Sequence, residues 1–223
     1  VEVGDRFADQ SFDVIIFFAC LEHMTHEERL AAMRTTWQML PAGGFWCLID
    51  TPNRLWYYDA HTSLLPFYNW LPHRLAFDYA QFSPRQDFRA VLSQFSSYDD
   101  AAHTMLMRLG RGLSFHEFEL AMGRLNSLDI VSDLVSFLLD QEAPQIPAPP
   151  TPWMRLKAAI PLRFKILLKG LPPPTEVYVP TPDDQYAAFL KAAAPDLHPG
   201  FLQPSLDLIL RKQGDRSEEK YGD

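Results

Sequence analysis

The sequence predicts an α/β fold, in which part of a parallel sheet is followed by a mainly helical insertion. Phe12–Cys20 is a continuous run of β-branched and aromatic residues, typical of a strand buried on both faces of a parallel sheet. Between Glu27 and Leu40 the apolar residues recur at spacings of three and four, as on one face of a helix. Phe45–Ile49 is a second apolar run, so the unit is a strand–helix–strand crossover.

Local signals mark the ends of the helix in this unit. Thr25 followed by Glu28 forms a capping box at its start, and Gly43-Gly44 ends it. Near the end of the chain, Ser205–Lys212 predicts a returning strand, antiparallel and at the edge of the sheet.

The rest of the chain divides by composition. Residues 1–51 form the partial sheet domain, residues 52–142 a mainly helical insertion, and residues 143–152 a proline-rich linker. Residues 153–212 hold a basic amphipathic segment and the returning elements, and residues 213–223 a polar, disordered tail. Helical patterns occur at residues 84–96, 97–109, 114–125, 128–141 and 183–194.

Composition limits the function classes. The chain of 223 residues is 47% hydrophobic, which supports a real core. Its net charge of −8 argues against nucleic-acid binding, which favours a basic surface. Cys20 and Cys47 both fall in the predicted strands, so we expect packed free thiols and a cytoplasmic protein. No apolar run approaches the ~20 residues of a membrane span.

Four short motifs, in this order and spacing, suggest a family: Gly4-Asp5, Ser11–Ile15, Leu21–Met24 and Leu40–Gly44. Together they resemble the middle and C-terminal part of class I S-adenosylmethionine-dependent methyltransferases, which have a seven-stranded Rossmann-like domain. The block that begins at Thr51-Pro52-Asn53-Arg54 resembles a bacterial subgroup of that family. The resemblance covers about the first 80 residues and is thin beyond them.

The resemblance implies S-adenosylmethionine as the cofactor. An acidic residue at the position of Asp5 lies near the adenine in that family, and we place its neighbour Arg6 there too. Ala19, Cys20 and Leu21 end the first predicted strand, where open α/β sheets bind ligands, and are the other predicted cofactor contacts. A turn following Gly4 is the alternative role for Asp5.

The chain departs from the family at its start. It begins at Val1, directly before Gly4-Asp5, and it contains no Gly-x-Gly-x-Gly loop of the kind that cradles such a cofactor. We therefore expect a methyltransferase fragment that binds the cofactor poorly and is inactive alone.

Glu22 and His23 are the first candidates for chemistry. A neutral His23 could act as general base on an acceptor hydroxyl, with Glu22 contacting the substrate. Ubiquinone-type O-methyltransferases hold a divalent metal with a similar Glu-x-x-Glu-His block, but here its first position is Ala19. We predict no metal, and packing of the loop is the structural alternative for both residues.

A second polar cluster follows the strand that begins at Phe45. His61 is a candidate catalytic base, and Arg54 has the bidentate fork that binds carboxylate or phosphate. The alternative is a structural network, because the neighbouring aromatic side chains would bury well. The predicted substrate-binding residues here are Asn53, Arg54, Tyr58 and Asp59, the last of which could orient His61.

The resemblance implies methyl transfer to a small-molecule or lipid-like acceptor, with the helical insertion at residues 52–142 covering the substrate. Trp153–Leu171 carries five basic residues and no acid among apolar residues, which suggests peripheral contact with an anionic membrane, or else a helix pair packed on the domain. The alternative function is a non-catalytic module that binds a partner chain through an exposed sheet edge.

Overall fold

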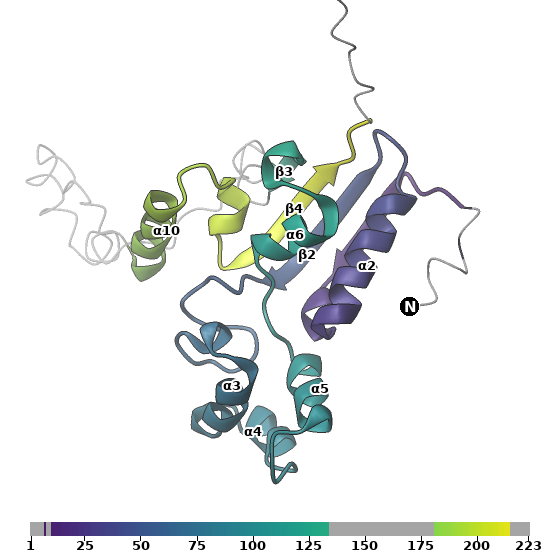
Figure 1. Cartoon of the computed structure of the whole chain (residues 1–223). Helices are drawn as coiled ribbons and strands as arrows, with labels where there is room; N and C mark the ends of the chain where they lie inside the picture. Colours follow the sequence, from purple (N-terminus) through teal and green to yellow (C-terminus); the bar gives the residue numbers. More distant parts are fainter. Residues whose placement is uncertain (1–6, 8–9, 134–180, 215–223) are drawn as a thin grey trace, which may run out of the picture.

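A four-stranded mixed sheet organises the molecule (Figure 1). The computed structural model describes residue 7, residues 10–133 and residues 181–214. The sheet has the order β1-β2-β4-β3; β1 and β2 run parallel, and β4 is antiparallel to both of its neighbours. This confirms the predicted α/β class. The strands are β1 (Val14–Phe18), β2 (Phe45–Pro52), β3 (Asp129–Asp133) and β4 (Ser205–Arg211).

Helix α2 (His26–Met39) connects the two parallel strands and covers one face of the sheet (Figure 1). The predicted capping box is confirmed, since Thr25 and Glu28 each accept a hydrogen bond from the other's backbone N–H. Trp46 of β2 is fully buried in this interface, and its indole N–H donates to Thr36 Oγ1 at 3.0 Å. The indole is therefore buried without leaving its N–H unpaired.

The first strand is not buried on both faces, which corrects the sequence prediction. Ile15 and Phe17 pack into the core, but Val14, Ile16 and Phe18 are 49%, 61% and 64% exposed among the described residues. The reason is the alternation of side chains along a strand: α2 lies on one face, and β1 is one of the two outermost strands of the described sheet.

Two further predictions about strands are wrong. β4 is antiparallel as expected, but it lies inside the sheet because β3 pairs with its far side. The helix predicted over residues 128–141 is instead β3 at Asp129–Asp133, and the rest of that range lies outside the described residues. An ion pair between Arg211 and Asp129, at 2.7 Å, joins the two strands directly across the ladder.

The helices predicted after β2 are confirmed with shorter bounds. α3, α4 and α5 gather beyond the carboxyl end of β2 (Figure 1), around a small core of their own that includes Tyr68, Phe88 and Leu106. The sequence did not predict α3. The bounds are α3 (His73–Tyr79), α4 (Gln86–Leu92), α5 (Asp100–Arg108), α6 (Phe115–Met122) and α10 (Pro182–Ala193).

Several sequence predictions fall outside the described residues. These are the linker at residues 143–152, the basic segment Trp153–Leu171 and most of the tail at 213–223. Within the described residues, no helix is both long and apolar enough to cross a membrane. Cys20 and Cys47 are free thiols as predicted, and burial raises the pKa of each, which makes them poor nucleophiles.

Candidate functional site

The candidate site begins where the two parallel strands end side by side. Ala19, just after β1, has a φ of 44°, and Asp50, late in β2, has a φ of 56°. Left-handed backbone is unfavourable for residues other than glycine and concentrates at functional sites. Both turns are secured, because Ala19 N–H donates to Ile49 O at 3.0 Å and Asp50 N–H donates to Asp207 Oδ1 at 2.9 Å.

Glu22 follows the first of these turns and is completely buried. It lies in the short 3-10 helix η1 (Leu21–His23), with 0% of its surface exposed. Its Oε2 accepts a hydrogen bond from Thr51 Oγ1 at 3.3 Å, which ties η1 to β2. Its Oε1 has no hydrogen-bond partner among the described residues. Burying a carboxylate oxygen without a hydrogen-bond partner costs free energy of folding, which suggests that this oxygen binds a ligand or an ion.

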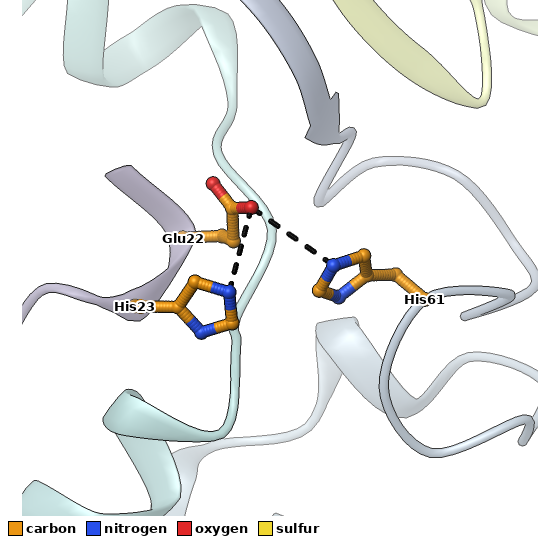
Figure 2. A group of neighbouring side chains, drawn as sticks. All are labelled: Glu22, His23 and His61. Carbon is orange, nitrogen blue, oxygen red and sulfur yellow. Dashed lines mark ion pairs between the residues drawn. The ribbon is translucent and has the colours of Figure 1, made fainter. Parts of the chain in front are cut away.

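Two histidines converge on that oxygen (Figure 2). His23 Nε2 lies 3.6 Å from Glu22 Oε1, and His61 Nε2 lies 3.9 Å from the same atom. The two imidazole rings are 5.6 Å apart between centroids. The structure therefore brings together three predicted site residues from the ends of both parallel strands.

His23 is oriented by the end of α5. Its Nδ1 lies 2.8 Å from the carbonyl oxygen of Arg108, and the Arg108 guanidinium donates to His23 O at 2.9 Å. The same guanidinium binds Glu28 Oε1 at 2.6 Å and, mainly through that hydrogen bond, lowers the pKa of Glu28 to about 2. The capping box of α2 is thus part of the support for His23.

His61 is held by the loop that follows β2. Its Nδ1 lies 2.9 Å from Thr62 Oγ1, and Arg85 donates to His61 O at 2.7 Å. Among the described residues, no hydrogen bond or ion pair joins Asp59 to this imidazole; its carboxylate accepts from the backbone N–H groups of Thr62 and Ser63. Asp59 therefore fixes the loop that carries His61 instead of orienting the ring itself. No local sequence pattern pointed to Thr62 or Arg85.

A cavity of about 250 Å³ opens beside His61 at the carboxyl end of β2. Four predicted residues line it: Asn53, Tyr58, Asp59 and His61. Asn53 is buried and its amide is fully engaged, since Nδ2 donates to Phe201 O and Gln203 O at 2.8 Å each and Oδ1 accepts from Leu55 N–H. The Asn53 amide and the Asp59 carboxylate are thus occupied by hydrogen bonds within the protein. The imidazole of His61 and the hydroxyl of the exposed Tyr58 are the predicted groups in the lining that could contact a ligand.

Arg54 is not among the residues that line this cavity. It is half-buried, and burial lowers the pKa of its guanidinium, an effect that the charge of Glu117 partly opposes. Arg54 therefore does not share the wall of this cavity with His61, and the charge of the buried Glu117 acts on its guanidinium.

A buried arginine that the sequence analysis overlooked supports the whole site. Arg29 of α2 is 0% exposed, and it donates to the carbonyls of Leu21 and Glu22 in η1 and to Arg111 O at 2.8 Å. It also pairs with Glu117 at 2.7 Å. Its spacing could have revealed it, because Arg29 lies four residues before Met33 and seven before Thr36, on the buried face of α2.

The predicted cofactor contacts are only partly described. Asp5 and Arg6 lie outside the described residues. Ala19 and the half-buried Cys20 form the turn after β1, as expected for residues at a strand end. The Leu21 side chain is fully buried in the core, and its carbonyl accepts from Arg29 Nε at 3.0 Å.

Glu22, His23 and His61 can transfer a proton or bind a cation where Glu22 Oε1 meets the two imidazole Nε2 atoms. Comparison of the chain with protein-family models, curated proteins and solved structures finds no match.

Proposed function

We propose that this protein takes part in S-adenosylmethionine-dependent methyl transfer to the hydroxyl of a small-molecule or lipid-like acceptor. One observation carries the proposal: Glu22, His23 and His61 converge at the carboxyl ends of β1 and β2, beside a cavity. Open α/β sheets bind their ligands at this position. The mixed sheet is compatible with a Rossmann-like domain, and the sequence motifs support the choice of methyl transfer.

The cluster suits the chemistry of a hydroxyl acceptor. S-adenosylmethionine, when bound, supplies an electrophilic methyl group. A hydroxyl attacks such a group best once its proton is removed, so the site must control that proton. An imidazole Nε2 can accept it directly, with the Glu22 carboxylate stabilising the imidazolium. Alternatively, Glu22, His23 and His61 would hold a cation, which would lower the pKa of a bound hydroxyl. The walls of the cavity would contribute by positioning the acceptor.

Among the described residues, only the turn at the end of β1 offers contacts for S-adenosylmethionine. Ala19, Cys20 and Leu21 provide a tight turn after β1 but no charged side chain that would hold a ribose. We therefore assign these residues, together with Asp5 and Arg6, to the proposed cofactor site on the strength of position and resemblance. The proton-handling role of the cluster does not depend on that assignment.

Transfer of a tritiated methyl group to pooled phenols, hydroxy acids and hydroxylated lipids tests the proposal. The assay uses this chain and, if its gene extends upstream of Val1, the complete gene product. We expect His61→Ala and Glu22→Gln to lower turnover at least tenfold while cofactor affinity stays within twofold. His116→Ala is the control, because His116 is exposed and lies outside the cluster. The proposal fails if the complete product transfers no methyl group, or if all three variants retain full turnover.

A second candidate function has its own supporting observation. The exposed side chains of Val14, Ile16 and Phe18 form an apolar stripe on the outermost described strand, which suits binding of a partner chain. For this interaction module, substitutions on the stripe would abolish function, whereas His61→Ala would leave it unchanged.

A further inference from the structure

We propose that Glu22, His23 and His61 form a binding site for a divalent transition-metal ion of the Zn²⁺ class. This reverses the sequence prediction that the chain carries no metal site. The inference deepens the proposed function, because the ion would lie where the acceptor hydroxyl is activated. Its test does not depend on methyl transfer.

The three donor atoms already form a compact triangle. Glu22 Oε1 lies 3.6 Å from His23 Nε2 and 3.9 Å from His61 Nε2, and one ligand atom from each residue falls within 4.8 Å of the others. Ligand atoms around a tetrahedral zinc ion, with bonds of about 2.1 Å, lie about 3.4 Å apart. Slight contraction of the triangle therefore gives a three-ligand site, and two imidazoles with one carboxylate are a donor set that zinc accepts.

The unpartnered oxygen of Glu22 is the second, independent observation. Oε1 has no hydrogen-bond partner among the described residues, although the side chain is 0% exposed. The two arginines that donate to carbonyls of η1 already have carboxylate partners, since Arg29 pairs with Glu117 at 2.7 Å and Arg108 with Glu28 at 2.6 Å. A bound cation would supply the charge that this buried carboxylate oxygen lacks.

The hydrogen bonds of the two imidazoles leave both Nε2 atoms as ligands. His23 Nδ1 lies 2.8 Å from Arg108 O, and a carbonyl only accepts, so Nδ1 carries the proton of the neutral ring. His61 Nδ1 contacts Thr62 Oγ1, which donates its own hydrogen to Leu109 O at 3.4 Å and therefore accepts from the ring. Metal-ligating histidines are held in this way, with the second nitrogen donating to an oxygen.

The Glu22 carboxylate is also held by a hydrogen bond from outside the cluster, and the site is open to an ion from solvent. Glu22 Oε2 accepts from Thr51 Oγ1 at 3.3 Å, which leaves Oε1 directed at the two rings (Figure 2). The imidazole side chains of His23 and His61 are 40% and 34% exposed. Three protein ligands leave a fourth coordination position, and an acceptor oxygen bound there would lose its proton more readily.

Isothermal titration of the chelator-treated full chain with Zn²⁺ tests the site, together with the visible absorption of the Co²⁺-substituted protein. We expect one equivalent of Zn²⁺ to bind, and the intense Co²⁺ bands of a four-coordinate site. Glu22→Gln and His61→Ala should each weaken binding at least 100-fold. Thr62→Val removes the hydroxyl that joins His61 Nδ1 to Leu109 O but no metal ligand, and should weaken binding about tenfold. The exposed His116→Ala should bind as the wild type does.

Near-ultraviolet circular dichroism establishes that each variant is folded before titration. The metal site is excluded if Zn²⁺ fails to bind the folded wild type, or if binding survives both Glu22→Gln and His61→Ala unchanged. Absence of binding together with His61-dependent methyl transfer would leave the proposed function intact, with an imidazole as the base. Zn²⁺ binding without methyl transfer would uphold the site and remove the proposed function.

Discussion

At the scale of single residues, the site depends on charges that the fold buries in pairs. Arg29 and Glu117 are both buried and lie 2.7 Å apart, directly behind η1. Burial alone would raise the pKa of Glu117, but hydrogen bonding with His26 and the charge of Arg29 outweigh it and lower that pKa to about 2. The pair therefore stabilises the ionised form of Glu117 in the folded state.

This pair makes stability depend on acid pH. The folded pKa of Glu117 is below its unfolded value of about 4.3, so its contribution is present above pH ~4.3 and is lost as the pH falls toward 2. We expect Glu117→Gln to lower the free energy of unfolding at pH 7 by about 3 kcal/mol, because Arg29 is left buried without its carboxylate.

Urea unfolding at pH 7 and at pH 3 measures this effect. The difference between variant and wild type should shrink at pH 3, where the wild type has lost part of the same contribution. Glu27→Gln is the matched control, since Glu27 is exposed on the same helix α2 as Arg29. An equal loss of stability at both pH values would contradict the ionic explanation.

At the scale of elements, the segment before α6 passes very close to the end of β2. Leu113 N–H donates to Pro52 O, and Arg54 N–H donates to Leu113 O. A Cβ at Gly112 would lie 2.7 Å from Arg54 N and 2.8 Å from Pro52 O. Only glycine allows this approach, which connects the site to the helix that follows.

Gly112→Ala should therefore destabilise the protein by about 1–3 kcal/mol, because the added methyl group meets backbone atoms that cannot move aside. The midpoint of urea unfolding measures the change. Gly214→Ala is the control, since its Cβ would meet only Ala42 Cβ, at 3.6 Å. Equal midpoints for the two variants would show that the contact is not tight.

The helices and strands also show which features could be predicted from the sequence. The capping box at Thr25 is a local signal, and it occurs as expected. β3 was predicted as a helix because its strand state depends on pairing with β4, which lies far away in the sequence. The convergence of Glu22 and His61 likewise depends on strand adjacency and on Thr51, Thr62 and Arg108, which carry no local signal. The residue types of Glu22 and His61 suggested catalytic roles, but they did not indicate that the two residues share one site.

At the scale of the whole molecule, the two faces of the sheet differ. Leu206, Leu208 and Leu210 of β4 are buried on the face that α2 covers. On β1, the side chains of Ile16 and Phe18 point the other way and are more than half exposed. Contiguous exposed apolar side chains on an outermost strand favour association with another chain.

We therefore expect the isolated chain to self-associate through β1. Replacing Ile16 and Phe18 together with lysine should shift the chain toward monomer in sedimentation equilibrium, with little loss of stability because both side chains are exposed. Leu120→Lys is the control, since Leu120 is 57% exposed on α6, away from this strand. A wild type that stays monomeric at high concentration, or a control that has the same effect, would contradict this expectation.

Arg111 has a consequence for how the molecule unfolds. Its guanidinium donates to Tyr68 O and Leu71 O in the helical group, while its backbone N–H donates to Glu22 O and its carbonyl accepts from Arg29. Hydrogen bonds of the buried Arg111 therefore join the core beneath the sheet to the core of the helical group. Separating the cores would strand these charges without partners, so the sheet and the helical group should lose their structure in a single cooperative transition.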